Sequence, residues 1–247
     1  MTYGAENIRP YKDDENKTAQ VERMFDTIAG RYDQLNRTLS LGFDKGWRKK
    51  GVNFLKPYAP KKILDVATGT GDLAINMCKI INPETIIGVD LSEEMMDIGR
   101  KKVSVAKLDK SIHFEQQDSL SLTYPNNTFD AVTAAFGVRN FENIEQGLKE
   151  MYRVLKPGGH LMILELSAPE KFPMKQLFKL YSKTVIPFMG WLFSKEKSAY
   201  SYLPETIQVV PQGKVMTTLL ENVGFTKTKA KTFTLGVCTM YTGTKDK

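Results

Sequence analysis

The sequence predicts an α/β fold built on one mostly parallel sheet of seven strands, with helices on both faces of the sheet. Short apolar runs alternate with longer amphipathic stretches through the middle of the chain, which is the pattern of βα units. The apolar runs are nearly continuous, as in strands that are buried on both faces. A length of 247 residues suits a single domain of this kind.

Five apolar runs define the core strands of this sheet. We expect these strands at residues 61–66, 85–90, 111–118, 129–136 and 160–166. Helical periodicity places helices between and after them, at 72–80, 93–103, 144–155 and 213–223. Two last extended stretches, 225–235 and 237–244, flank Gly236 and predict a terminal strand pair.

Two further segments surround this core within what we expect to be one domain of residues 1–247. Residues 1–55 are expected to form a helical N-terminal lid, and residues 61–166 a core that binds a cofactor. Residues 167–212 form an insert with helical patterns, and residues 213–247 supply the last helix and the strand pair. No internal repeat or low-complexity linker divides the chain.

The composition excludes several classes of protein. With 41% apolar residues, the chain is not intrinsically disordered. The two cysteines are far apart and the two histidines are isolated, so we expect a reducing compartment and no zinc site. The N-terminus has no signal-peptide pattern, and the membrane-like stretch 184–194 is too short to span a bilayer. The expected location is therefore the cytoplasm.

A glycine-rich turn follows the first strand. Gly69 and Gly71 let the backbone turn sharply into a helix whose free N–H groups can face a ligand. Asp90 ends the second strand, where a carboxylate can accept hydrogen bonds from both hydroxyls of a ribose. These features alone fit either a dinucleotide or an adenosyl cofactor.

Three further features favour the adenosyl cofactor. Asp65 lies four residues before Gly69 and completes the pattern D-x-x-x-G-x-G. Asp118 ends the third expected strand, where its carboxylate can meet an adenine amino group and the N–H of Ser119 a ring nitrogen. Residues 155–159, Leu-Lys-Pro-Gly-Gly, join a helix to the fifth strand. Together these motifs resemble the class I S-adenosylmethionine-dependent methyltransferases.

The resemblance implies a Rossmann-like fold with an antiparallel last strand, S-adenosylmethionine as the cofactor, and no metal. It places the glycine loop near the amino acid part of the cofactor. The residue at the end of the second strand is expected to contact the ribose, and the residues at the end of the third strand the adenine. The implied cofactor-binding residues are Asp65, Gly69, Thr70, Gly71, Asp90, Asp118 and Ser119.

Motifs along nearly the whole chain, from about residue 21 to residue 245, narrow this resemblance. They lie at residues 24–36, 40–48, 136–140, 151–159, 164–167 and 200–207. Together they are similar to the quinone-biosynthesis C-methyltransferases, the family of demethylmenaquinone methyltransferase and the ubiquinone-pathway methoxy-benzoquinol methylase. Two positions depart from the family. The glycine loop reads Ala67-Thr68-Gly69-Thr70 where many members have a further glycine, and Ala135 stands where some carry a serine.

The family resemblance implies methyl transfer to a ring carbon of a lipid-tailed quinol, and three residues for the chemistry. Arg139 and Asn140 follow the fourth strand, where an arginine can stabilise a phenolate and an amide can orient a ring oxygen. Tyr32, on the lid, could bond a quinol oxygen. The alternatives are a salt bridge from Arg139 to a nearby acid such as Glu142, and ordinary packing of Tyr32.

The insert is basic and rich in aromatic residues. Between residues 171 and 214 it holds seven lysines and two glutamates, a net +5 out of the whole chain's +7. Lysines at 171, 175, 179 and 183 follow one helical stripe, and the apolar stretch 186–193 comes next. Such a segment can lie on an anionic membrane face, line a groove for a polyprenyl tail, or pack on the core with solvated lysines.

Several alternatives stay open at this point. The substrate could be a naphthoquinol, a benzoquinol or both, and a methyltransferase acting on RNA, a sterol or a small phenol is a second class. No nucleic-acid partner is expected, because the chain has no separate RNA-binding module. An NAD-dependent oxidoreductase and a non-catalytic binding protein are the remaining readings. Whether the chain forms a homo-oligomer is open.

Overall fold

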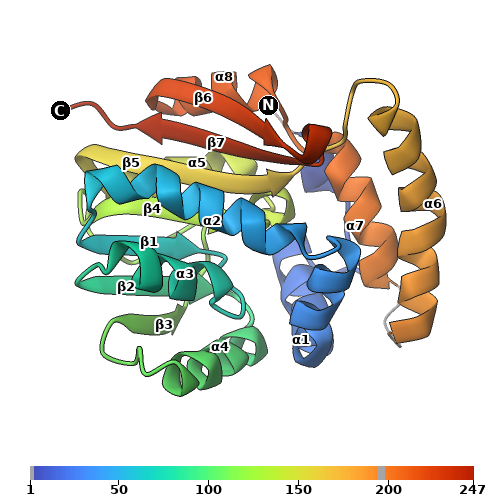
Figure 1. The fold of residues 1–247 in the computed structure, drawn as a ribbon, viewed down its shortest axis with the longest axis horizontal. Coiled ribbons are helices and arrows are strands. Elements are labelled where there is room, and N and C mark those ends of the chain that lie inside the picture. The colour runs from blue at the N-terminus through green and yellow to red at the C-terminus, as the bar shows by residue number, and fades with distance from the viewer. Residues whose placement is uncertain (1–2, 194–197) are drawn as a thin grey trace.

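The computed structural model confirms a seven-stranded sheet, with the strand order β3-β2-β1-β4-β5-β7-β6 (Figure 1). It describes residues 3–193 and 198–247, without the side chains of residues 187–193, 198 and 200. Strands β1 to β5 are parallel, and β7 is antiparallel to both of its neighbours. The strands are β1 (Lys62–Val66), β2 (Thr85–Asp90), β3 (Ile112–Gln116), β4 (Phe129–Ala135), β5 (Leu155–Leu166), β6 (Thr226–Phe233) and β7 (Cys238–Thr244).

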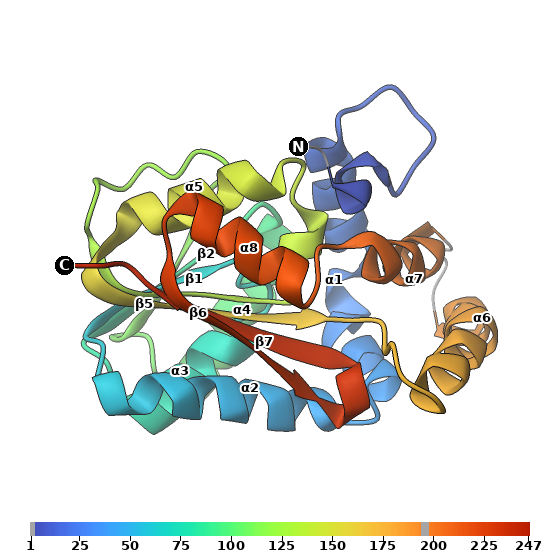
Figure 2. The same ribbon diagram turned by 90° about the horizontal axis from the view of Figure 1, so that it is seen from above.

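Helices cover both faces of the sheet, as the alternating pattern predicts (Figure 2). Helices α2 and α3 pack on one face, and α5 and α8 on the other. Helix α4 follows β2, and α1, α6 and α7 lie beyond the carboxyl ends of the parallel strands (Figure 1). The helices are α1 (Lys17–Leu39), α2 (Phe43–Leu55), α3 (Asp72–Ile81), α4 (Glu93–Val105), α5 (Ile144–Val154), α6 (Met174–Phe193), α7 (Ser198–Val209) and α8 (Lys214–Val223).

The central strands are buried on both faces because helices cover each side. Along β1, Leu64 and Val66 join the core beneath α5 and α8, whereas Ile63 joins the core beneath α2 and α3. Side chains of a strand alternate between its two faces, so each strand contributes to both cores. This double burial explains why the strands appear in the sequence as continuous apolar runs.

Most strand boundaries lie within two residues of those expected from the sequence, and the differences in β5 and β3 bear on the site. Strand β5 starts at Leu155, five residues early, and residues 156–159 bulge between two paired positions. Gly158, at φ +80°, allows this bulge, and its N–H donates to the carbonyl of Lys245 at 2.7 Å. Strand β3 ends at Gln116, so Asp118 lies in the following loop rather than at the strand end.

The two segments outside the core are helical, as predicted. The N-terminal segment forms α1 and α2, which meet at Gly42 with φ +77°. The insert forms α6 and α7. In the described part of the chain, none of the helices combines the length and the apolar character needed to cross a membrane.

Candidate active site

A cavity lies at the carboxyl ends of β1, β2 and β4, beneath helix α1. Four of the residues implied as cofactor ligands line it, namely Gly69, Asp90, Asp118 and Ser119. They come from the three consecutive connections that follow β1, β2 and β3. The topology brings them together because parallel strands direct these connections to the same edge of the sheet.

The glycine loop after β1 has the conformation that its glycines allow. Gly69 has φ +55° and Gly71 has φ +73°, both in the left-handed region. At Gly71 a Cβ atom would lie 2.7 Å from the ring of Phe114, so a side chain there would collide with the core. The N–H of Gly69 donates to Oδ2 of Asp90 at 2.7 Å, which joins the loop to the end of β2.

Asp90 is poised as an acceptor facing the cavity. Its Oδ1 accepts from the N–H of Ser92 at 3.1 Å, and its Oδ2 from the N–H of Gly69. Burial raises the pKa of Asp90, and these two N–H groups oppose the rise because they stabilise the charged form. Each carboxylate oxygen has further lone pairs that can accept from hydroxyl groups of a ligand.

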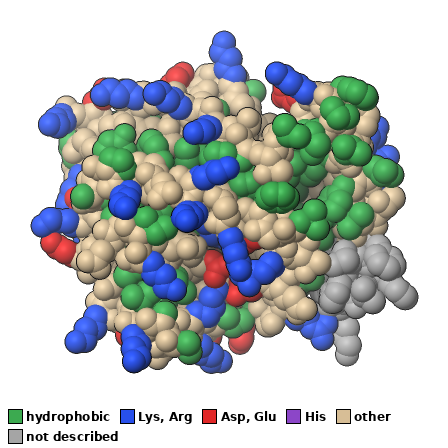
Figure 3. Space-filling model, viewed as in Figure 1, with side chains coloured by type: hydrophobic (Ala, Val, Ile, Leu, Met, Phe, Trp, Pro, Cys, Tyr) green, Lys and Arg blue, Asp and Glu red, His purple; other side chains and the backbone are tan. Residues whose placement is uncertain are grey.

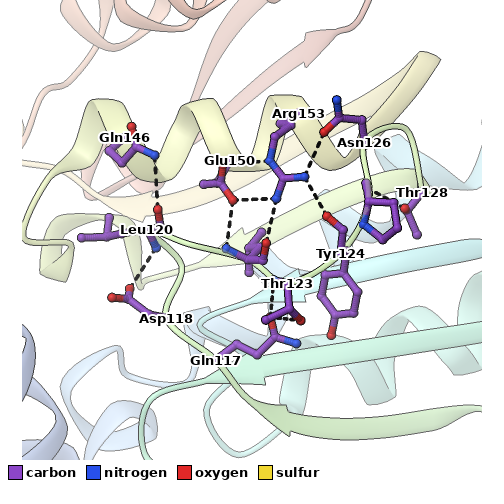
Figure 4. Close-up of polar contacts among 12 residues, drawn as sticks. Gln117, Asp118, Leu120, Thr123, Tyr124, Asn126, Thr128, Gln146, Glu150 and Arg153 are labelled. Atoms are coloured by element: carbon purple, nitrogen blue, oxygen red, sulfur yellow. Dashed lines mark hydrogen bonds and ion pairs between the residues drawn. The ribbon is translucent and has the colours of Figure 1, made fainter.

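The loop that carries Asp118 and Ser119 is held in place by helix α5 (Figure 4). Arg153 donates to the carbonyls of Leu122 at 2.8 Å and Tyr124 at 2.7 Å. Glu150 accepts from the N–H of Leu122 at 2.9 Å and pairs with Arg153 at 2.7 Å. This pair fixes the backbone of a long irregular connection. Arg153 lies in the motif at residues 151–159, but the sequence does not show that it pairs with Glu150 or binds this loop.

Three of the implied cofactor residues lie behind the cavity wall rather than on it. The Asp65 carboxylate is buried and accepts from the hydroxyls of Thr68 at 2.8 Å and Thr133 at 2.6 Å. Burial raises the pKa of Asp65 to about 6. The Thr70 hydroxyl donates to Asp33 at 2.6 Å, away from the cavity, and Gly71 caps α3. These residues shape the loop from behind.

Helix α1 covers the cavity and is joined by hydrogen bonds and an ion pair to the segments beneath it. Asp33 accepts from Thr70 and pairs with Lys102 at 2.9 Å. About two turns earlier on α1, Asp26 accepts from the Ser92 hydroxyl at 2.6 Å. These contacts join α1 to the glycine loop, to α4 and to the loop after β2.

A second, smaller cavity of about 50 Å³ adjoins the first. It lies between α1, α7 and the short 3-10 helix η3 (Val138–Asn140). Tyr32 and Asn140 line both cavities, and Arg139 and Tyr202 line the small one. The three residues implied for the chemistry are therefore brought together at one place, next to the candidate cofactor site.

Arg139 is buried and forms an ion pair, but with a different acid from the one considered above. Its Nη1 donates to Oε1 of Glu165 at 2.7 Å, and its backbone N–H donates to Oε2 of the same carboxylate at 3.1 Å. Glu142 instead accepts from the hydroxyl of Thr18 at 2.7 Å. The alternative that pairs Arg139 with Glu142 is wrong in its partner, because the end of β5, which carries Glu165, lies directly beside the turn after β4.

The ion pair keeps Arg139 charged. Burial alone would lower the pKa of Arg139, but the charge and hydrogen bond of Glu165 outweigh it and raise that pKa. Arg139 can therefore stabilise a negative charge but cannot accept a proton. The sequence did offer a signal for Glu165, since it is a single acid within the apolar run of β5.

Lys17, which the sequence analysis did not single out, anchors the start of α1. It is 1% exposed, and its Nζ donates to the carbonyls of Ala5 at 2.7 Å and Phe141 at 3.2 Å. Burial lowers its pKa to about 8. These bonds tie the lid to the turn that carries Asn140. A lone lysine in a polar segment gives no sequence signal for such a role.

A third cavity, of about 500 Å³ and mostly apolar, adjoins the small one on the other side. It shares Asn36, Arg139 and Leu203 with the small cavity, and α6 forms its outer wall. Hydrophobic side chains gather around a hollow on this side of the molecule (Figure 3). The predicted apolar stretch 186–193 belongs to α6, but beyond residue 186 its side chains lie outside the described residues.

Trp47 and Arg48 of α2 line this cavity. The indole N–H of Trp47 donates to the hydroxyl of Thr234 at 2.8 Å. Arg48 forms a buried ion pair with Asp44 at 2.5 Å, four residues earlier on α2. Neither contact reaches the cofactor cavity. The Trp47 bond joins α2 to the turn between β6 and β7, whereas the Arg48 pair lies within α2.

The described residues contain no cluster of three or more histidine, cysteine or acidic side chains that could hold a metal ion. His160 stacks on Tyr58 with ring centroids 3.6 Å apart, and His113 is exposed on β3. Both histidines lie away from the three cavities, in keeping with structural roles.

The fold and the site define the class of protein. A glycine loop after β1, acidic residues after β2 and β3, and a last strand inserted antiparallel between β5 and β6 form the class I S-adenosylmethionine-dependent methyltransferase fold. A SAM-dependent methyltransferase from Thermotoga maritima matches with a TM-score of 0.64 at 18% identity, covering 91% of this chain and 99% of that one. The [4+2]-cyclase SpnF matches with a TM-score of 0.62 at 17% identity, covering 93% and 96%.

The chain belongs to the ubiE/COQ5 methyltransferase family, whose model matches residues 12–245. The demethylmenaquinone methyltransferase of Bacteroides fragilis is 56% identical over 99% of this chain and 100% of its own length. That of Porphyromonas gingivalis is 49% identical over 97% and 98%. The ubiquinone/menaquinone biosynthesis C-methyltransferase UbiE of Geobacter sulfurreducens is 42% identical over 93% and 90%. The chain is therefore a methyltransferase.

Proposed function

We propose that this methyltransferase transfers a methyl group from S-adenosylmethionine to a ring carbon of demethylmenaquinol, giving menaquinol. The observation that carries the proposal is the order of the three adjoining cavities. A candidate cofactor site leads to a small chamber with several polar groups, and that chamber leads to a large apolar cavity. This order matches a methyl donor, a quinol ring and a polyprenyl tail.

The full-length relatives support the choice of substrate. Those of B. fragilis and P. gingivalis are named for demethylmenaquinone, and the more distant UbiE relative is named for both quinone pathways. The second candidate is therefore C-methylation of the polyprenyl methoxy-benzoquinol of ubiquinone biosynthesis.

The cofactor residues have distinct proposed roles. Asp90 accepts hydrogen bonds from the ribose hydroxyls, and Asp118 and the N–H of Ser119 meet the adenine. The loop Gly69-Thr70-Gly71 lies by the amino acid part, with Gly69 in contact. Asp65, Thr70 and Gly71 act by holding that loop. The cavity has the donors and acceptors that an adenosyl group needs, and when bound the cofactor supplies an electrophilic methyl group.

The chemistry proposed for the protein is to orient the quinol and stabilise its phenolate. Electron density from a ring oxygen makes the neighbouring ring carbon nucleophilic, and loss of the phenolic proton to water strengthens this effect. The ring carbon gains the methyl group as the methyl–sulfur bond breaks, with S-adenosylhomocysteine as the leaving group, and then loses its own proton to water, which restores the aromatic quinol. Arg139, held in its charged form by Glu165, stabilises the phenolate. Asn140 and Tyr32 orient the ring, since both face the chamber and the cofactor cavity. The N-terminal lid, residues 1–55, excludes water.

A transfer assay with labelled S-adenosylmethionine tests this function. With chemically reduced quinols, we expect label in demethylmenaquinol, and a lower KM for a long-tailed substrate than for one without a tail, because the tail buries apolar surface in the large cavity. The ubiquinone-pathway quinol is run in parallel. Absence of label in either quinol, with S-adenosylhomocysteine binding intact, would contradict the proposal.

We also propose that the protein contacts the anionic inner face of the cell membrane, where a lipid-tailed quinol resides. Large apolar side chains are exposed on α6 and its approach, at the start of α2 and on the turn between β6 and β7: Leu41, Phe43, Phe172, Leu177, Leu180 and Leu235. Four of them, Leu41, Phe43, Leu177 and Leu180, line the apolar cavity. The same helix and its approach carry four exposed lysines: Lys171, Lys175, Lys179 and Lys183. Apolar insertion combined with positive charge is the chemistry of peripheral binding to anionic lipid.

Vesicle sedimentation tests this contact. Changing the four lysines to glutamine is expected to weaken binding to vesicles rich in anionic phospholipid by about 100-fold or more, since each lysine near such a surface contributes about 1 kcal/mol. The matched control changes four exposed lysines on the far side, around α3 and α4: Lys79, Lys101, Lys107 and Lys110. Equal losses in both variants, or equal binding of the native protein to zwitterionic vesicles, would contradict this surface.

A further inference from the structure

Three buried side-chain atoms have no hydrogen-bond partner among the residues that the structure describes. They are Nε of Arg139, Oδ1 of Asn140 and the hydroxyl of Tyr202. All three residues line the same small cavity between α1, α7 and η3. Because buried polar groups are nearly always bonded, three such atoms around one cavity indicate a polar ligand.

Arg139 and Asn140 already belong to the proposed site, whereas Tyr202 has no role there. Tyr202 lies on α7 and is 3% exposed. Its ring packs against Val21 and Met24 of the lid helix, which fixes the direction of the hydroxyl. Burial raises the pKa of Tyr202, so at neutral pH the phenol keeps its proton and acts as a donor.

The three unpartnered atoms complement the polar groups of a hydroquinol. Arg139 and Tyr202 offer N–H and O–H donors, and Asn140 offers a carbonyl acceptor. Asn140 also lines the cofactor cavity, whereas Tyr202 does not. The next residue, Leu203, lines the apolar cavity. Arg139 lines the small and the apolar cavities. Tyr202 is thus placed farther from the methyl donor than Asn140, beside a residue that faces the tail cavity.

Resting on the proposed quinol methylation, we infer that Tyr202 is a substrate-binding residue that donates a hydrogen bond to the ring oxygen next to the tail-bearing carbon. The carbon to be methylated is adjacent to the other oxygen, and that oxygen supplies the electron density for attack. A donor on the tail-side oxygen orients the ring without withdrawing density from the activating one. Tyr202 thereby selects which ring carbon faces the methyl donor.

The variant Tyr202→Phe removes only the hydroxyl. We expect kcat/KM for the quinol to fall roughly 10- to 100-fold, with the affinity for S-adenosylhomocysteine unchanged. We expect the Tm of the ligand-free protein to stay the same or to rise by roughly 2–4 °C, because an unsatisfied buried group is removed. The matched control is Tyr58→Phe, on a half-exposed tyrosine that stacks on His160 far from the cavities.

A substrate analogue identifies the oxygen. With a tailed naphthol that lacks the tail-side hydroxyl, Tyr202→Phe and the native protein should have the same kcat/KM. With the complete quinol, the variant should show the whole decrease in kcat/KM. A kcat/KM within about twofold of the native value on the quinol, or a Tm several degrees lower, would overturn this inference while leaving quinol methylation intact. A native enzyme that methylates no quinol would overturn both.

Discussion

Replacing Arg139 with lysine is expected to lower the rate of methyl transfer by about 100- to 1000-fold, the usual effect of losing a group that stabilises developing negative charge. Lysine keeps the charge beside Glu165, so the acid is not left unpaired. However, its N–H groups all lie on one nitrogen, whereas the guanidinium bonds Glu165 through Nη1 and presents the separate N–H of Nε to the chamber. Single-turnover measurements at saturating cofactor would report the chemical step.

Two controls separate this effect from loss of the fold. Arg100→Lys makes the same change at a surface pair with Glu93, and the rate should be unchanged. Arg139→Ala is a poor test because it leaves Glu165 buried without its partner, which is expected to cost about 3–5 kcal/mol of stability. A rate for Arg139→Lys within threefold of the native value, in a stably folded protein, would remove Arg139 from the proposed chemistry.

Replacing Asp90 with asparagine is expected to weaken binding of S-adenosylhomocysteine by about 100-fold, measured by titration calorimetry. The carboxylate accepts from the N–H groups of Gly69 and Ser92, and by the proposal from the two ribose hydroxyls. Hydrogen bonds to a charged group are worth about 1.5–3 kcal/mol each. An amide has one acceptor atom, and its NH₂ group would face a backbone N–H or a hydroxyl instead.

The matched control for this variant is Asp97→Asn, on the exposed face of α4, where the acid pairs only with Arg100 among the contacts that the structure gives it. Its cofactor affinity should match that of the native protein. If Asp90→Asn binds S-adenosylhomocysteine as tightly as the native protein, the ribose contact is at another residue and the proposed orientation of the cofactor is wrong.

Several features of the site could be predicted because they depend on local sequence. The ends of β1 and β2 follow from short apolar runs, and a glycine loop or an acid directly after a run lies at the carboxyl edge of a parallel sheet. Gly69, Asp90 and Asp118 therefore appear on one cavity, as the resemblance implies. Asp65, by contrast, does not line the cavity. Its spacing suggests a ligand, but its side chain is enclosed by Thr68 and Thr133 behind the loop.

The sequence by itself determined the α/β class, the strand pattern, the glycine loop and the family motifs, because these depend on periodicity and on residues close together in the chain. Only the tertiary structure decided that Arg139 pairs with Glu165, that Lys17 ties the lid to the turn beside Asn140, and that the Tyr202 hydroxyl is buried without a partner among the described residues. These contacts join residues 26 to 124 positions apart. Side-chain chemistry permits many such pairings, and the packing of helices α1 and α7 across the end of the sheet selects among them.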